Sequence, residues 1–353
     1  MGEKYPGGLT IIADEEVREL KPEEYSLWDN LVEKSPQGTI FHTSSWLLLI
    51  SKYFKKDLKI FGCFEGEDLT GGCSLFIDNL FLGNLKYVSS TCEFTQYGGF
   101  VLADIQTTKI RGNEIHHFSS IKKICDYLHE KKLDSKYIDI TNSSGFRDIR
   151  PFIWEGWNSE VHYTYYINLQ NNIDQNISKD IRKKINYCIQ HSITVKKSED
   201  AATHYNLLSK VFYRQNFEAP PKEFFKAVID LLAKKNMGEM WVAETPDGDI
   251  IASRIILWDK KRAYAWSAAS DPDFEKREGN AFLLYNVLQI FKERGFKEID
   301  MMQANTPRLK FFITGFNPYL EPNYKIFKKN RVFFPIFILH GITRAFIKKY
   351  FLK

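Results

Sequence analysis

A charged, glycine-bearing turn runs directly into a long apolar helical pattern in the second half of the chain. The turn reads KREGNA, so that Lys276 and Arg277 precede a helix expected to begin at Gly279, with Asn280 and Ala281 in its first turn. The first N–H groups of a helix have no acceptor within it and lie at the positive end of its dipole, which suits a phosphate group. Glycine would let that phosphate come close to the backbone. The alternative is an ordinary polar turn before a helix.

A cluster of basic residues in the stretch SKDIRKKINY is a second candidate. It places Lys179, Arg182, Lys183 and Lys184 close together on an expected helix. Because Arg and Lys both pair with phosphate oxygens, the cluster could hold a phosphate or an acidic acceptor. A solvated helix face is the alternative, since runs of charge usually lie in water.

Asp300 lies in the strand-like stretch KEIDMM that follows the long helix. Sheets of α/β proteins place their sites at the carboxyl ends of strands, so Asp300 could orient a substrate group or act as a base. A structural hydrogen bond to a neighbouring loop is the alternative. Tyr264 and Tyr285 could act as acids, but we expect both to be core aromatic residues.

The remaining reactive residues exclude several other kinds of chemistry. The five cysteines are scattered without a CxxC pair or zinc spacing, and the eight histidines form no HExxH motif, so we expect free thiols and no metal site. No Ser-His-Asp or Cys-His arrangement can be argued from the sequence. Direct transfer between two bound substrates therefore fits better than a covalent enzyme intermediate.

The composition is that of a globular protein with more than one core. The chain has 353 residues, of which 44% are hydrophobic and 26% charged, and this length predicts two domains. No apolar run is long enough to span a bilayer, and the first residues lack the layout of a signal peptide, so we expect a cytoplasmic protein. The net charge of +5 is mild, and we expect no DNA partner.

The predicted elements occur in the same order in both halves. Each half shows helices, then sequential strands, then a long helix, then further strands, although no residue-level repeat is visible. In the second half the stretch 238–258 predicts a hairpin around Asp247-Gly248, and 297–302 predicts the strand after the long helix. A duplicated α/β unit with a mixed sheet is the economical interpretation.

These pieces resemble the GNAT-type acyltransferases of the Fem group, which include the aminoacyltransferases that build peptidoglycan bridges. The resemblance rests on DIRKKINYCIQHS, WVAETPDGDIIASRIIL, AYAWSAASD, GNAFLLYNVLQIFKERGFKEIDM and TPRLKFFITGFNP, and in the first half on TIFHTSSWLLLI and YGGFVLAD. It implies two tandem GNAT domains and acyl transfer to an amine. The implied donor is aminoacyl-tRNA or acyl-CoA, and no cofactor is expected to bind tightly.

The resemblance also implies roles for particular residues. Lys276 stands where related CoA-binding loops carry Gln or Arg, and Arg182 matches a basic position typical of the family. Lys310, in PRLKFF, matches a lysine near the active centre that could stabilise a developing oxyanion. The pair Gly98-Gly99 could allow a close backbone approach in the first half.

The expected organisation has three parts. Residues 1–165 would form a domain that serves the acceptor or the structure, and 166–330 would bind the donor and catalyse the transfer. Residues 331–353 would form a basic amphipathic tail that packs back on the first domain, or that contacts an anionic membrane surface. From Lys325 onward the chain has eight Lys or Arg residues and no Asp or Glu.

We therefore expect an N-acyltransferase that uses acyl-CoA or aminoacyl-tRNA. Its acceptor would be an amine of a cell-envelope precursor, an amino sugar or a peptide. The KREGNA turn favours CoA, and the absence of a long heptad arm weighs against tRNA. The alternative, from another class, is a non-catalytic binding module with a degenerate GNAT fold.

Overall fold

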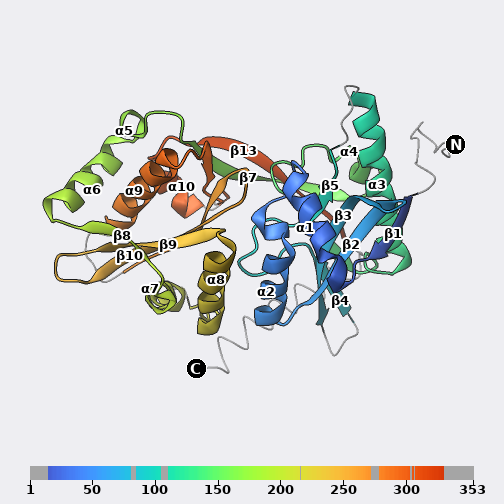
Figure 1. Ribbon diagram of the computed structural model, residues 1–353, viewed down its shortest axis with the longest axis horizontal. Coiled ribbons are helices and arrows are strands. Elements are labelled where there is room, and N and C mark those ends of the chain that lie inside the picture. The colour runs from blue at the N-terminus through green and yellow to red at the C-terminus, as the bar shows by residue number, and fades with distance from the viewer. Residues whose placement is uncertain are drawn as a thin grey trace. The chain divides into compact units, whose positions relative to one another are not determined.

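The computed structural model describes residues 15–80, 85–104, 110–214, 216–271, 278–302, 304–305 and 307–329. They divide into two compact units, which Figure 1 shows as ribbons. The first unit contains the described residues up to Val161 and those from Asn323, and the second is His162–Pro322. The chain thus leaves the first unit once and returns to it with its last described strand.

The first unit is a mixed sheet with helices. Its elements are β1 (Glu15–Glu19), α1 (Tyr25–Lys34), α2 (Ser44–Phe54), β2 (Asp57–Glu65), β3 (Asp68–Leu80), β4 (Leu85–Ser89), β5 (Gly99–Leu102), α3 (Ile110–Glu130), β6 (Tyr137–Thr141) and α4 (Arg150–Trp154), with short 3-10 turns at Pro22–Glu24 and Ile40–His42. The strand order is β1-β2-β3-β4-β6, with β5 also on β3, and the end of β13 (Tyr319–Lys329) pairs with β6. Only β4 and β6 are parallel.

The second unit repeats this plan. Its elements are the end of β7 (Asn158–Asn168), α5 (Ile173–Asn176), α6 (Lys179–Gln190), β8 (Thr194–Ser198), α7 (Ala201–Arg214), α8 (Lys222–Lys235), β9 (Gly238–Glu244), β10 (Ile250–Trp258), β11 (Ala263–Ser270), α9 (Gly279–Glu293), β12 (Glu298–Asp300), α10 (Pro307–Thr314) and the start of β13. The strand order is β7-β12-β11-β10-β9-β8, and only β11 and β12 are parallel. The predicted mixed α/β sheet is confirmed.

A short sequence echo accompanies the repeated plan. The strand after the long helix reads KYIDIT in the first unit and KEIDMM in the second, so that Asp139 and Asp300 occupy equivalent places. Both aspartates are buried and lie in the strand after the long helix, which pairs in parallel with β4 in the first unit and with β11 in the second. Topology was therefore needed to recognise a residue-level repeat that the sequence alone did not reveal.

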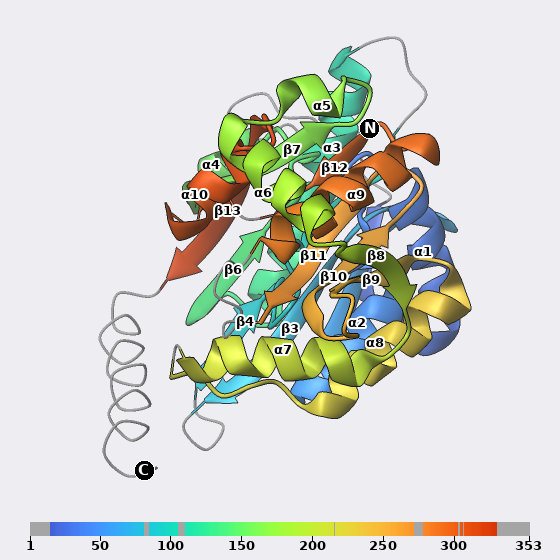
Figure 2. The same cartoon turned by 90° about the vertical axis from the view of Figure 1, so that its left-hand side faces the viewer.

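Two local predictions in the second unit are confirmed. The stretch 238–258 folds as the antiparallel pair β9 and β10, and Gly248 in the turn has φ of +92°, a conformation that favours glycine. Helix α9 begins at Gly279, as the apolar pattern predicted. In Figures 1 and 2, α6 and α9 lie on one face of this sheet, and α7 and α8 lie on the other.

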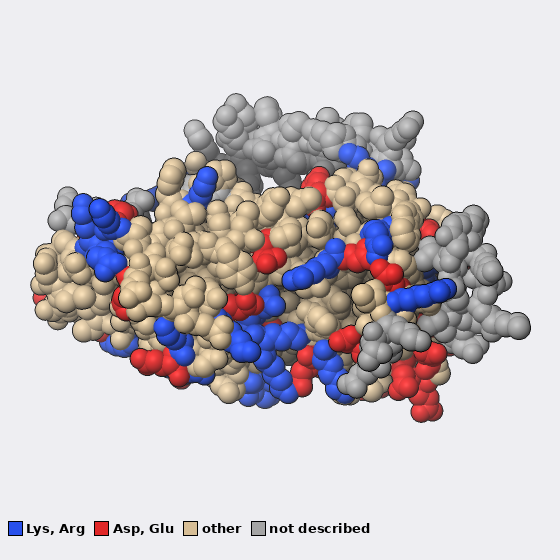
Figure 3. All heavy atoms as spheres, turned by 90° about the horizontal axis from the view of Figure 1, so that it is seen from above, with Lys and Arg blue, Asp and Glu red and all other residues tan. Residues whose placement is uncertain are grey.

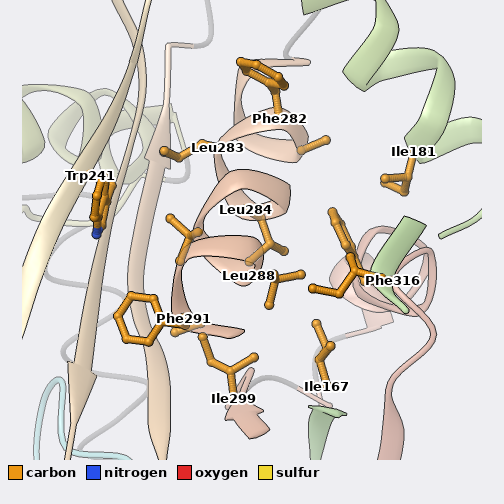
Figure 4. Close-up of a cluster of buried hydrophobic side chains, with 14 of the residues drawn as sticks. Ile167, Ile181, Trp241, Phe282, Leu283, Leu284, Leu288, Phe291, Ile299 and Phe316 are labelled. Atoms are coloured by element: carbon orange, nitrogen blue, oxygen red, sulfur yellow. The ribbon is translucent and has the colours of Figure 1, made fainter. Parts of the chain in front are cut away.

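Helix α9 is the centre of the second unit's core. Figure 4 shows Leu284, Leu288 and Phe291 of α9 among side chains from β7, β12, α6 and the segment that follows α10. Fully burying such a side chain stabilises the fold by about 1.5–3 kcal/mol. Several of them together hold α9 firmly, so the position of its N-terminus is fixed by apolar packing.

Candidate functional site

The parallel strands β11 and β12 of the second unit pair for only a short distance. The register joins Ala263 to Ile299 and Tyr264 to Asp300, and no further pairing of the two strands is found among the described residues. Strand β11 continues to Ser270 along β10. Beyond Tyr264, β12 therefore no longer pairs with β11 along that edge within the described residues.

The chain after β12 follows β7 instead of β11. The N–H of Met301 donates to the carbonyl of Tyr165 at 2.8 Å. The side chain of Asn305 then accepts from the N–H of Tyr163 and donates to its carbonyl, both at 3.0 Å. An asparagine side chain thus extends the ladder along β7, and the two parallel strands diverge beyond Asp300.

The first turn of helix α9 lies against Ile251 and Ala252 of β10, and Ala252 pairs with Ser270 at the end of β11. The N–H groups of Ala281 and Phe282 both donate to the carbonyl of Glu278, at 3.0 and 3.1 Å. The N–H groups of Gly279 and Asn280 have no acceptor within the helix, and no side chain among the described residues caps it. Two donors at the positive end of the helix dipole are thus available for an anion.

Gly279 has a packing role that the sequence did not reveal. A Cβ at this position would lie 2.7 Å from Cδ1 and 2.8 Å from Cγ1 of Ile251 in β10. Glycine therefore lets the first turn of α9 approach the sheet. Its predicted part in phosphate binding would come from its N–H group, since its missing Cβ faces Ile251.

Arg254 lies beneath this end of the helix. It is 3% exposed, and its Nη2 donates to Oδ1 of Asn280 at 2.7 Å. Its Nε is buried without a partner, and no carboxylate pairs with it among the described residues. Burial lowers the pKa of the Arg254 guanidinium to about 10, so that the group is still charged at neutral pH. The sequence carried a signal for Arg254, a lone charge within the apolar strand IIASRIILW.

Asp300 is engaged in holding the turn after β12. It is fully buried, and its Oδ1 accepts from Thr164 Oγ1 at 2.5 Å and from the N–H of Met302 at 2.8 Å. Met302 has φ of +60°, an uncommon conformation for a residue with a side chain. These bonds fix the segment that turns away from β11, which favours the structural alternative for Asp300.

The two tyrosines considered as proton donors are also engaged. Tyr264 is buried, and its hydroxyl donates to Asp259 at 2.6 Å; burial, then the Asp259 charge, raise its pKa well above the usual range. The hydroxyl of Tyr285 donates to Asp174 at 2.5 Å, and its pKa is also raised, first by burial. Neither tyrosine is poised to ionise.

The other predicted site residues lie in different places. Lys310, on α10, is exposed, and its side chain has no polar partner among the described residues. Arg182, on α6, is exposed and donates to the carbonyl of Asp174 at 2.6 Å, while the neighbouring Lys184 pairs with Asp180 at 2.8 Å. Lys276 and Arg277 lie outside the described residues, as does the tail 331–353.

Acidic and basic side chains are mixed on the surface. On the face shown in Figure 3, Lys and Arg side chains lie among Asp and Glu side chains, and most of the face is uncharged. No group of three or more His, Cys, Asp and Glu within the described ranges could hold a metal ion. Across those same residues, no helix has the length and apolar character needed to cross a bilayer.

His204 is a buried polar residue on the other face of β10. One ring nitrogen lies 2.9 Å from Ser253 Oγ, and the other lies 2.8 Å from Ser267 Oγ. Burial, and then the nearby charge of Arg254, lower the pKa of His204 to about 3. The imidazole is therefore neutral at physiological pH, and it links α7 to β10 and β11.

The equivalent place in the first unit is closed by hydrogen bonds. Beyond the parallel pair of Ser89 and Asp139, Ser90 donates its N–H to the carbonyl of Asp139 at 3.0 Å. The hydroxyl of Ser90 then accepts from the N–H of Thr141 at 2.9 Å, and the N–H of Gly98 donates to the carbonyl of Thr141, also at 2.9 Å. The segment between β4 and β5 thus bridges the two strands.

The Gly98-Gly99 pair makes this bridge possible. A Cβ at Gly98 would lie 2.0 Å from the carbonyl oxygen of Ser90, and one at Gly99 would lie 2.3 Å from Cγ2 of Ile140. Gly99 also has φ of +88°. The close backbone approach expected from these glycines is present, and it closes the gap between the strands of the first unit instead of forming an open groove there.

Part of the second unit matches a known protein family. Residues 175–311 match the model of a family described as an acetyltransferase (GNAT) domain. No curated protein sequence matches the chain at a significant level. The second unit thus contains a GNAT-type domain, and an acyltransferase is the class that the match supports.

Solved structures extend the likeness to almost the whole chain. FemX has a TM-score of 0.67 at 13% identity, covering 92% of this chain and 99% of its own. The C-terminal domain of a putative lysylphosphatidylglycerol synthetase from Agrobacterium fabrum has a TM-score of 0.54 at 12% identity, covering 87% and 92%. A tandem GNAT protein from the clavulanic acid pathway has a TM-score of 0.51 at 10% identity, covering 89% and 97%. The chain therefore has the tandem GNAT fold, which confirms the predicted fold class.

Proposed function

We propose that this protein is an N-acyltransferase whose donor lies in the second unit, along β11 beyond the end of its pairing with β12. The observation that carries the proposal is the divergence of β11 and β12 beyond Asp300, in the same unit as the uncapped N-terminus of α9. An extended thioester or ester chain could take ladder hydrogen bonds from the edge of β11, while its phosphate meets the N–H groups of Gly279 and Asn280. The bridged strands of the first unit offer no such place, so that unit would serve the acceptor or the structure.

The chemistry would be direct attack by an amine. The deprotonated amine nitrogen bonds to the donor carbonyl carbon, the tetrahedral intermediate breaks the C–S or C–O bond, and the leaving group takes up a proton. Backbone N–H groups on β11 and the ammonium of Lys310 are the candidates for stabilising the oxyanion. Lys310 suits this role better than Asp300 suits that of a base, because Asp300 already accepts two hydrogen bonds.

The donor is acyl-CoA or aminoacyl-tRNA, and the acceptor is an amine of a cell-envelope precursor, an amino sugar or a peptide. Likeness to FemX and to a putative lysylphosphatidylglycerol synthetase domain favours aminoacyl transfer at the envelope. The family model that matches the second unit favours acyl-CoA. A cytoplasmic location fits both donors.

Turnover assays test the proposal directly. The purified full chain is incubated with acetyl-CoA, longer acyl-CoAs or aminoacyl-tRNA and a panel of amines, with thiol or tRNA release and product mass as readouts. An amide product with stoichiometric release supports the proposal. Binding of CoA or charged tRNA by calorimetry, without turnover of any amine, would instead favour a binding module.

Lys310 gives a variant for the same assay. Lys310→Ala should lower kcat by roughly 10²-fold with donor affinity kept, as is typical when one oxyanion-stabilising group is removed. Lys297→Ala is the matched control, since Lys297 is also an exposed lysine of the second unit. Equal kcat values for the two variants would assign Lys310 to the surface.

A further inference from the structure

Arg254 is a buried charge without a counter-charge among the described residues. Arg294, an exposed arginine just after α9, differs from it, since Arg294 reaches the buried carboxylate of Glu239 at 2.5 Å. Arg254 instead makes a single side-chain hydrogen bond, to the neutral amide of Asn280, and leaves Nε unpartnered. A guanidinium removed from water is costly unless an anion or several hydrogen bonds compensate it. The folded protein therefore buries a cation at this place with no carboxylate partner among the described residues.

That place is the first turn of α9. Asn280 is the second residue of the helix, and its N–H and that of Gly279 have no acceptor within the helix. Two independent sources of positive potential thus coincide there, namely the helix N-terminus and the buried guanidinium. Their fields add in a poorly solvated region, where charge interactions are stronger than in water.

The bond from Arg254 also determines what Asn280 offers to a ligand. A guanidinium has only donors, so Asn280 must turn its carbonyl oxygen toward Arg254. Its NH2 group is then left as a donor, beside the N–H groups of Gly279 and Asn280. The first turn of α9 therefore presents donors and no acceptor from Asn280, a pattern that suits an anion and disfavours a cation or a neutral hydroxyl.

We propose that Arg254 is a positioning residue for a phosphate group, which supplies its missing counter-charge when it binds at the first turn of α9. This rests on the proposed function and deepens it, because it assigns to Arg254 a part in binding the donor's phosphate. Arg254 acts through Asn280 and through its field, since it is 3% exposed.

The proposal gives two effects of opposite sign for one substitution. Arg254→Met keeps an unbranched side chain and removes the uncompensated charge, so the protein without ligand should be at least as heat-stable as the wild type. The same variant should bind inorganic pyrophosphate about tenfold or more weakly, and its KM for the donor should rise while kcat is kept. A purely structural arginine would give the reverse, a lower Tm and an unchanged response to pyrophosphate.

The measurement is Tm as a function of pyrophosphate concentration at constant ionic strength, for the full-length wild type and each variant. The wild type should gain Tm with pyrophosphate, and Arg254→Met should need about tenfold or more pyrophosphate for the same gain. Arg294→Met is the matched control at the other end of α9. It should lower Tm without ligand, because the buried Glu239 carboxylate loses its closer cationic partner and keeps only Lys197 at 3.4 Å, and it should retain the pyrophosphate response. A wild type without any response, or an Arg254→Met protein with the full response, overturns the proposal.

Asn280→Asp keeps the proposal testable if Arg254→Met fails to fold. The new carboxylate would lie 2.7 Å from Nη2 of Arg254, so that the protein itself would supply the counter-charge in place of a bound phosphate. It should raise Tm without ligand and abolish the pyrophosphate response, whereas an Asn280→Asp protein with an unchanged Tm and full response overturns the proposal. The proposed function can fail separately from this inference. If the wild type binds pyrophosphate but forms no amide product, the role of Arg254 stands and the acyltransferase function is excluded. If the enzyme turns over and Arg254→Met has an unchanged donor KM, the acyltransferase function stands and the role of Arg254 is excluded.

Discussion

At the scale of single residues, strand β10 carries polar side chains on both of its buried faces. Ser253 contacts His204 of α7 on one face, and the next residue, Arg254, contacts Asn280 of α9 on the other. The alternation of a strand makes this arrangement possible. The two faces differ in what they leave unsatisfied, because both ring nitrogens of His204 have partners, whereas Nε of Arg254 has none. The helix on the second face is therefore the better place to look for a ligand.

His204 predicts a specific response to acid. Its pKa is lowered to about 3 in the folded protein and is about 6.5 in an unfolded chain. Below pH 6.5 the unfolded state therefore binds a proton that the folded state does not, so stability present above pH 6.5 is lost as the pH falls toward 3. The slope is about 1.4 kcal/mol per pH unit, or roughly 2 kcal/mol between pH 6.5 and 5.

Urea unfolding of the wild type and of His204→Gln at pH 7 and pH 5 measures this response. Glutamine can bond both serines and does not titrate. The wild type should lose roughly 2 kcal/mol more than the variant over this interval. Equal losses would mean that the imidazole is not held neutral in the folded state.

At the scale of elements, the position of α9 relative to β10 depends on the missing Cβ of Gly279. Gly279→Ala should lower the free energy of unfolding by about 1–3 kcal/mol, because Ile251 must move to make room for the new methyl group. The better helix propensity of alanine should offset up to about 1 kcal/mol of this loss. The measurement is a double-mutant cycle with Ile251→Ala, which empties the space that the new methyl group needs. If Gly279→Ala costs the same in both backgrounds, the contact with Ile251 is not the reason for the glycine.

The same helix shows what the sequence could and could not predict. The apolar period and the glycine predicted where α9 begins, since both are local features. The contact of Gly279 with Ile251 could not be predicted, because it joins residues 28 positions apart whose meeting depends on how the helix packs on the sheet. Asp300 shows the same limit, since its position at a strand end was visible while its bonds to Thr164 and Met302 arise from the turn.

The sequence contains a signal for Arg254 that none of the candidate motifs includes. A charged residue in the centre of an apolar strand must have a reason, because burying it is costly. Its partner Asn280 was predicted to be in the site from the KREGNA motif, and the strand residue beneath it was not. The Gly98-Gly99 pair was recognised as a close approach, but whether it opened or closed a groove depended on Ser90 and Thr141, which follow no motif.

At the scale of the whole molecule, the two units share a topology and differ at one place. The parallel strands of the first unit are bridged by Ser90 and Gly98, whereas β11 and β12 of the second diverge without such a bridge among the described residues. Of the two units that share this topology, the second has diverging parallel strands and the first has bridged ones. This asymmetry favours one donor site per chain, in the second unit.

Because the chain returns to the first unit with β13, we expect the stability of that unit to depend on residues far along the sequence. In β13, Lys325 pairs with Asp139 at 2.6 Å, and Ile326 is fully buried in the first unit's core. Ile326→Ala should lower the stability of the first unit by about 2–5 kcal/mol. Hydrogen exchange should show faster exchange in β6 and α3, with α8 and β9 of the second unit less affected. Uniform changes in both units would contradict a local role for this strand.

The basic tail gives the last prediction, which rests on sequence because residues 330–353 lie outside the described residues. Five Lys or Arg residues and no Asp or Glu follow Lys329, and each cation near an anionic surface contributes about 1 kcal/mol. We expect the full chain to co-sediment with anionic vesicles at low salt, and to be released as the salt concentration rises. A chain ending at Lys329 should stay in solution. This truncation keeps all of β13, so loss of attachment would not follow from loss of that strand in the first unit. Neutral vesicles are the control. If the full chain does not co-sediment with anionic vesicles at low salt, the tail is assigned to packing within the protein.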